Sequence, residues 1–166
     1  MSEHNPGSYP MPPKDAGTSL LDAPPLRQVG NDVLPAFGMA MRSAPSSVEV
    51  ARRVTQAWVR CYCRMPKDQV ESILVVVSEL CTNAVLHGRH PSFDLRCWMP
   101  TPSELRLEIR DGSPSAVPEP QHVGPESESG RGLLLVDLLV SELGGSWGFT
   151  SDGTCAWFRL GLGEER

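Results

Sequence analysis

The stretch KDQVESILVVVSELCTNAVLH, from Lys67 to His87, contains neither proline nor glycine and largely decides the fold. At 100° per residue, many of its apolar side chains gather on one side, as in a helix that lies on a sheet. The residues expected on this side are Val70, Ile73, Val77, Leu80 and Ala84. Pro66, directly before the stretch, is well suited to a helix start. The sequence therefore predicts a long helix with one face in the core.

A line of polar residues follows the other side of this helix. Asn83 lies about 40° around the axis from Glu79 and about 6 Å further along it, and His87 follows one turn later. Val75, Val76 and Leu86 flank the line, so we expect this face to be covered as well. No Lys or Arg stands three or four positions from Glu79 to pair with it. A carboxylate and an amide oxygen one turn apart can hold a hydroxyl and a divalent cation. An ordinary solvated pair is the alternative.

The remaining elements are shorter. Ser46 and Ser47 offer N-caps for a helix that reaches about Cys63, and another helix follows residue 132 and ends near Gly144. Alternating patterns predict paired strands at 93–98 with 104–110 and at 146–150 with 155–160, with one more strand at 36–41. Strands in pairs, without βαβ alternation, indicate an α+β fold. We expect a two-layer sandwich whose sheet is mixed but mostly antiparallel, with helices on one face.

The ends of the 166-residue chain differ in composition from its middle. Residues 1–33 are rich in proline and lack a periodic apolar pattern, so we expect a disordered tail there. Residues 34–162 then form one domain, and 163–166 a short C-terminal tail.

Charge and cysteine content exclude several classes of protein. The net charge is -5, and no basic stripe suits a nucleic-acid backbone. The apolar runs are far shorter than a membrane span, and the N-terminus has no signal-peptide pattern. The five cysteines are an odd number without a CxxC pair, which favours reduced thiols. We expect a soluble, cytoplasmic protein that binds neither nucleic acid nor membrane.

Two further features suit a ligand. Gly130-Arg131-Gly132 precedes the third helix, where close backbone approach and the helix dipole favour an anion such as phosphate. Asp111 ends the strand at 104–110 and could accept a hydrogen bond from an amino group. Each feature also has a simpler explanation, since glycines often mark a loop-to-helix junction and Asp-Gly is a common turn pair. The chain contains no P-loop.

Taken in order, four motifs resemble the nucleotide-binding boxes of the GHKL ATPase/kinase superfamily. They are ELCTNAVLHG at 79–88, DGSP at 111–114, GRGLLLV at 130–136 and GTCAWF at 153–158. The chain looks most like the anti-sigma-factor serine kinases, especially their small actinobacterial relatives. The similarity runs from about residue 34 to residue 160 and implies an α/β sandwich, in agreement with the expected element order.

The resemblance implies a role for each polar residue. Glu79 would orient or deprotonate the attacking hydroxyl, and Asn83 would bind the Mg²⁺ that bridges the ATP phosphates. Asp111 would accept the adenine amino hydrogen, with Thr154 supporting the same contact and Gly112 beside it. His87 would stand near the phosphates.

The resemblance also implies a phosphate-binding segment and partners. Gly130, Arg131, Gly132 and Leu133 would surround the phosphates, and residues 113–129 would form a lid over ATP. The protein would phosphorylate the serine or threonine of an anti-anti-sigma (STAS-type) partner and would sequester a sigma factor. A homodimer is also expected from the resemblance.

Two alternative functions stay open. Ser113 stands where many members of the superfamily have a second glycine, and the lid segment is acidic, so a binding module that sequesters a partner with little or no phosphoryl transfer is the alternative. A detached histidine-kinase catalytic domain is less favoured, because the chain has no helical dimerisation segment with a phospho-accepting histidine.

Overall fold

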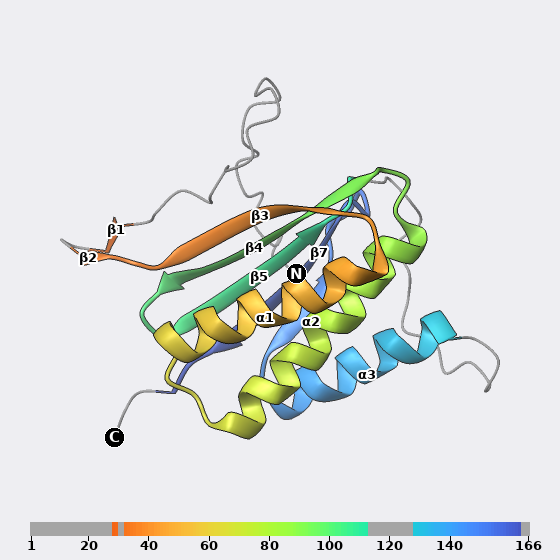
Figure 1. Cartoon of the computed structure of the whole chain (residues 1–166). Helices are drawn as coiled ribbons and strands as arrows, with labels where there is room; N and C mark the ends of the chain where they lie inside the picture. The colour runs from red at the N-terminus through yellow and green to blue at the C-terminus, as the bar shows by residue number, and fades with distance from the viewer. Residues whose placement is uncertain (1–27, 30–31, 113–127, 164–166) are drawn as a thin grey trace, which may run out of the picture.

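The computed structural model describes residues 28–29, 32–112 and 128–163 of the chain (Figure 1). Five strands form one sheet in the order β3-β4-β5-β7-β6, and each pairs with its neighbours antiparallel. The strands are β3 Ala36–Arg42, β4 Ser92–Thr101, β5 Glu104–Arg110, β6 Ser146–Phe149 and β7 Cys155–Gly161. The helices are α1 Pro45–Tyr62, α2 Lys67–His87 and α3 Glu128–Glu142.

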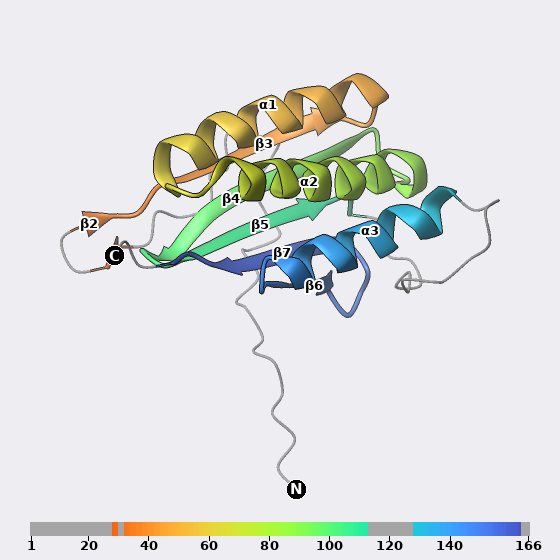
Figure 2. The same ribbon diagram turned by 90° about the horizontal axis from the view of Figure 1, so that it is seen from below.

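The three helices lie side by side on one face of the sheet, as the view from below shows (Figure 2). The α+β sandwich expected from the sequence is confirmed, with α2 between the two other helices. The parallel strand pair that a mixed sheet would contain is not found among the described strands, where every pairing is antiparallel.

Alternation along the strands places the core between the two layers. Leu105, Leu107 and Ile109 of β5 are buried, whereas the residues between them are half-buried. Leu107 is paired with Phe158 of β7 and Cys97 of β4, which are also buried. Period-two patterning therefore turns one face of the sheet toward the helices.

The central helix α2 supplies the other half of the core. Its predicted core residues are all buried, and the full buried set is Val70, Ile73, Leu74, Val76, Val77, Leu80, Cys81 and Ala84. By length and composition alone, α2 is also the one helix of the described chain that could cross a membrane. The core helix of a compact domain passes the same test, and the buried residues of α2 explain its apolar character here.

Two helix starts differ from the expectation. The N-cap of α1 is Ala44, without a side-chain hydrogen bond, so the predicted caps at Ser46 and Ser47 are wrong. Pro45 takes the first helical position, because its fixed φ fits a first turn and its missing N–H is not needed there. The third helix begins at Glu128 and includes Gly130 and Gly132 in its first turns.

Short segments at the ends bear on the predicted domain boundaries. The two-residue strands β1 Gln28–Val29 and β2 Asp32–Val33 pair antiparallel within the stretch expected to be a tail, and the sequence between them is Gly-Asn, which favours tight hairpins. Residues 1–27 and 164–166 lie outside the described part, so the domain limits stay predictions.

The cysteines are all free thiols, and only Cys61 is exposed. Burial raises the pKa of Cys63 to about 11 and that of Cys81 to about 12. At neutral pH these thiols are protonated and act as small apolar side chains.

Candidate functional site

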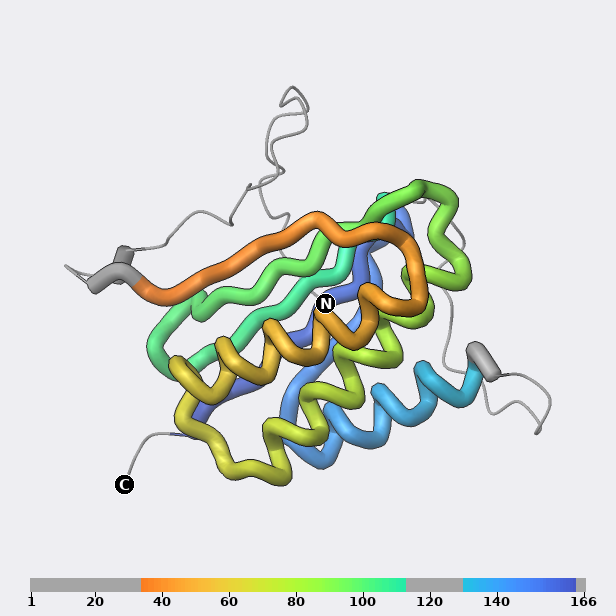
Figure 3. Tube along the Cα trace, in the orientation of Figure 1, coloured from red at the N-terminus to blue at the C-terminus, as the bar shows by residue number. Residues whose placement is uncertain are grey.

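Four elements meet at one end of the sandwich. There, α2 ends, β5 ends, β7 begins and the first turns of α3 lie close by (Figure 3). A Cβ added to Gly88, which caps α2, would lie 3.4 Å from Cβ of Asp111, which directly follows β5. The predicted site residues come from these four elements, so the fold gathers them at one end.

The Glu79 carboxylate lies directly against Gly132 of α3. A Cβ on Gly132 would overlap Oε2 of Glu79 and would lie 3.4 Å from its Cδ. Only glycine leaves room for the carboxylate in this position. The third predicted motif therefore packs onto the first, and both residues are half-buried.

The described residues do not satisfy the charge of Glu79. Among them, none donates a hydrogen bond to the Glu79 carboxylate or forms an ion pair with it. Half-buried Asn83 follows one turn later on α2, and exposed His87 is the last residue of the helix. A carboxylate held close to a neighbouring helix without a cation is suited to accept a proton or a hydrogen bond from a bound group.

A second cluster forms where β5 leaves the sheet. The backbone N–H groups of Asp111 and Gly112 both donate to the carbonyl oxygen of Thr154, at 3.1 and 3.3 Å. Gly112 has φ +71°, a conformation that favours glycine. These two hydrogen bonds join the second motif to the fourth.

The side chain of Thr154 has a partner within its own hairpin. Its hydroxyl donates to Oδ1 of Asp152 at 2.8 Å, and its backbone N–H donates to the same oxygen at 3.0 Å. The Thr150 hydroxyl donates there too, at 2.7 Å. These donors, that of Thr150 first, lower the pKa of Asp152 to about 2. The carbonyl of Thr154 faces Asp111, while its hydroxyl faces Asp152.

The other predicted residues surround the start of α3. Gly130 is half-buried, Arg131 is exposed and Leu133 is buried. Leu133 thus belongs to the core beneath the glycines. Of the predicted lid, residues 113–127 lie outside the described part of the chain, and 128–129 belong to α3.

Three residues near the site were not predicted to act there. His90 places Nε2 3.2 Å from the carbonyl oxygen of Gly112, and Gly88 packs beside Asp111. Asp152 anchors Thr154. Gly88 carried a signal, since a glycine commonly ends a helix. The contact of Asp152 with Thr154 is local, since an Asp in a turn commonly accepts from the residue two positions on. The contact of His90 with Gly112 depends on tertiary structure.

The resemblance implies a bound Mg²⁺, and the described side chains show which residues could hold it. No group of three or more His, Cys, Asp or Glu residues gathers to hold a metal ion in the described ranges. Mg²⁺ commonly takes only one or two protein oxygens and completes its shell with phosphates and water. Asn83, one turn after Glu79 on α2, fits such a site, because its amide oxygen is a hard ligand of the kind that Mg²⁺ takes.

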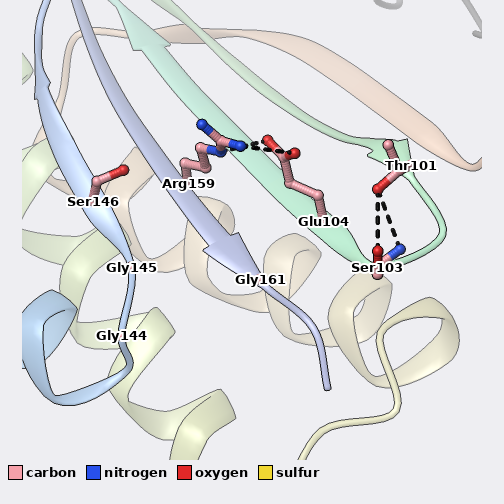
Figure 4. Close-up of a pocket in the computed structure, with 8 residues that line it drawn as sticks. All are labelled: Thr101, Ser103, Glu104, Gly144, Gly145, Ser146, Arg159 and Gly161. Atoms are coloured by element: carbon pink, nitrogen blue, oxygen red, sulfur yellow. Dashed lines mark hydrogen bonds and ion pairs between the residues drawn. The ribbon is translucent and has the colours of Figure 1, made fainter. Parts of the chain in front are cut away.

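A pocket of about 400 Å³ opens at the opposite ends of the same strands (Figure 4). There Oε1 of Glu104 lies 2.8 Å from Nε of Arg159 and 3.4 Å from Nε of Arg106. Glu104 begins β5 and Gly161 ends β7, so this pocket is distant from Asp111. Since two arginines neutralise Glu104, its charge is already satisfied.

A two-layer sandwich with these motifs gathered at one end defines a nucleotide-binding domain of the GHKL type. The family model of the histidine kinase-like ATPase domain matches residues 41–160, and the chain belongs to this family. It is therefore an ATP-binding, kinase-like ATPase domain. Comparison with curated proteins finds no match.

Proposed function

We propose that the protein is an ATP-dependent protein serine/threonine kinase that phosphorylates an anti-anti-sigma (STAS-type) protein and sequesters a sigma factor. The carrying observation is the Glu79 carboxylate, which lies against Gly132 and has no ion-pair partner among the described residues. A general base needs an acceptor of this kind within reach of the hydroxyl that it activates.

The proposed reaction moves one phosphoryl group. The hydroxyl oxygen of the substrate serine forms a bond to the γ-phosphorus of ATP, the bond from this phosphorus to the bridging oxygen breaks, and ADP leaves. Glu79 takes the hydroxyl proton. Positioning and charge stabilisation supply most of the catalysis in such transfers.

Asn83 would hold Mg²⁺ in this reaction. The ion supplies neutralisation of phosphate charge when bound. Asn83 follows Glu79 by one turn of α2, so the same helix would present the base and the metal ligand.

The turn after β5 would receive the adenine. The carboxylate of Asp111 would accept a hydrogen bond from the adenine amino group, and the Thr154 carbonyl fixes the backbone of Asp111 and Gly112 for that contact. Gly130 and Arg131 would bind the phosphates with Gly132, since the N-terminus of α3 favours an anion. A cytoplasmic location fits this function, because both proposed partners act there.

A phosphotransfer assay tests the proposal. Incubation of the protein with γ-labelled Mg-ATP and a cognate STAS-type partner is expected to label the partner. Glu79→Gln should reduce the label by at least about 100-fold, in line with the usual contribution of a general base. ATP binding, measured by calorimetry, should change little, because Glu79 acts on the substrate hydroxyl.

The matched control is Glu71→Gln, which changes an exposed glutamate on the same helix that pairs with Lys67. This variant should label the partner as well as the wild type does. Equal transfer by Glu79→Gln would contradict the assigned base. Binding of ATP and of the partner without any transfer by the wild type would instead favour the sequestering module.

A further inference from the structure

The connection between α2 and β4, residues 88–91, borders the turn at the end of β5. A Cβ added to Gly88 would lie 3.4 Å from Cβ of Asp111. His90, two residues after Gly88, contacts Gly112, the residue that follows Asp111. The connection therefore lies beside the proposed acceptor for the adenine amino group.

The imidazole of His90 makes two contacts with Gly112. Its Nε2 lies 3.2 Å from the carbonyl oxygen of Gly112. A Cβ added to Gly112 would lie 3.3 Å from Cδ2 of His90, so the ring also packs against the backbone of Gly112. Because a carbonyl oxygen only accepts, the hydrogen bond requires a proton on Nε2. His90 is therefore the donor in this contact.

Hydrogen bonds hold the turn from two sides. The N–H groups of Asp111 and Gly112 donate to the carbonyl of Thr154, whereas the carbonyl of Gly112 accepts from His90. Gly112, with φ +71°, has a wide range of accessible backbone conformations, so contacts from outside the turn must restrict it. Without His90, the turn loses its hydrogen bond on the carbonyl side.

The backbone that presents His90 is itself restricted. Pro91 follows His90 and disfavours a helical conformation for it. The carbonyl oxygen of Pro91 accepts a hydrogen bond from the Ser43 N–H at 2.9 Å, and the Gly88 N–H donates to the carbonyl of Ala84 at 2.9 Å. The connection is thus held at both ends, as a group that positions a site requires.

We propose that His90 is a positioning residue of the nucleotide site. By donating to the Gly112 carbonyl, it fixes the turn so that the Asp111 carboxylate meets the adenine amino group. The proposal rests on the proposed role of Asp111. Because His90 acts through Gly112, it should affect recognition of the base and not of the phosphates, which are proposed to bind at the start of α3.

Amide hydrogen exchange of the full chain without nucleotide tests the contact. His90→Ala should speed exchange of the Asp111 and Gly112 amides at least about threefold, because the turn opens more readily. His90→Gln should restore the rates to within about twofold of the wild type, because its side-chain amide can donate to the same carbonyl. Ser92→Ala, at an exposed residue two positions on, is the matched control and should exchange as the wild type does. Unchanged exchange in His90→Ala would overturn the proposal.

Calorimetric titration with Mg-ATP and with Mg-ITP tests the effect on base recognition. Inosine triphosphate carries a carbonyl oxygen where ATP carries the adenine amino group, so it cannot donate to Asp111. The wild type should prefer ATP, and His90→Ala should reduce this preference at least about threefold. His90→Gln should retain the preference. Equal weakening of both nucleotides in His90→Ala would indicate a general disturbance of the site and would also overturn the proposal.

The same titration of Asp111→Ala separates this proposal from the proposed function. If Asp111→Ala weakens ATP binding and His90→Ala does not, the positioning role is wrong and the adenine site stands. If the wild type does not bind Mg-ATP, both are wrong.

Discussion

Glu79 and Gly132 come from distant parts of the chain and meet where α2 and α3 pack. The contact explains why a glycine stands inside a helix, where it is otherwise unfavourable. Its absent Cβ is the space that the carboxylate uses. The position of the proposed general base therefore depends on one missing methyl group.

Substitution Gly132→Ala should separate stability from activity. Alanine favours a helix over glycine by about 1 kcal/mol, and the flexible end of Glu79 can move aside, so the melting temperature should hold or rise. The displaced carboxylate should lower phosphoryl transfer at least about tenfold. Thermal unfolding and the labelling assay measure the two effects.

The double variant Glu79→Ala/Gly132→Ala is the control for this prediction. Its activity should equal that of Glu79→Ala alone, because the alanine then has no carboxylate to displace. Full activity in Gly132→Ala, or a melting temperature well below that of the wild type, would contradict the close contact.

Asp152 should give the hairpin a pH dependence in acid. Hydrogen bonds from Thr150 and Thr154 lower its pKa from 3.8 to about 2 in the folded protein. Because the pKa of Asp152 is lower in the folded than in the unfolded protein, the ionised carboxylate stabilises the fold. This contribution is fully present above pH 4 and is lost as the pH falls toward 2. The contribution is modest, because Asp152 is exposed.

Melting temperatures of the wild type and Asp152→Ala between pH 2 and pH 7 measure this effect. The wild type should melt higher above pH 4, and the two curves should converge as the pH falls to about 2. If the difference between the two melting temperatures were the same at every pH in this range, the charge of Asp152 would not contribute to stability.

At the scale of elements, α2 combines the core and the site. Its inward side is buried against the sheet, and Glu79 and Asn83 lie on the half-buried remainder. One helix thereby ties the positions of these two candidate site residues to the packing of the core.

Two leucines of α2 test which side of the helix is buried. Leu80 is 1% exposed and Leu86 is 63% exposed. Leu80→Ala should cost about 2–5 kcal/mol of unfolding free energy, because it removes buried methyl groups and leaves a cavity. Leu86→Ala should change it by less than about 0.5 kcal/mol. Urea unfolding measures the unfolding free energy of both variants. Similar decreases in the two variants would contradict the orientation of α2.

Much of the fold was predictable because local periodicity carries it. The bounds of α2 and the strand pairs followed from apolar spacing and from the turn residues between them. The starts of α1 and α3 were less predictable. Both Pro45 and the serines after it suit the start of a helix, and the glycines of α3 disfavour a helix in its first turns.

The roles of the candidate site residues stay predictions, and their contacts were only partly predictable. Short motifs supplied the candidates, and the fold brings their elements together at one end (Figure 2). The approach of Gly132 to Glu79 arises only when distant segments pack, and no spacing along the chain encodes it. The hydrogen bonds from Thr154 to Asp152 are instead local, because the two residues are two positions apart in one turn.

At the scale of the whole molecule, the motif-bearing end and the pocket around Glu104 are spatially separate. The motif-bearing end holds Glu79 and Asp111, and the pocket lies at the far ends of the strands. The net charge of -5 fits a protein partner and a Mg²⁺-bound nucleotide better than a polyanion.

Calorimetric titration of the full chain with Mg-ATP tests most directly whether ATP binds where α2, β5 and α3 meet. The wild type should bind at one site, and Asp111→Ala should weaken binding at least about tenfold, because it removes the proposed acceptor for the adenine amino group. Asp68→Ala, at the other end of α2, should bind as the wild type does. Undetectable binding to the wild type, or equal affinity in Asp111→Ala, would contradict the account.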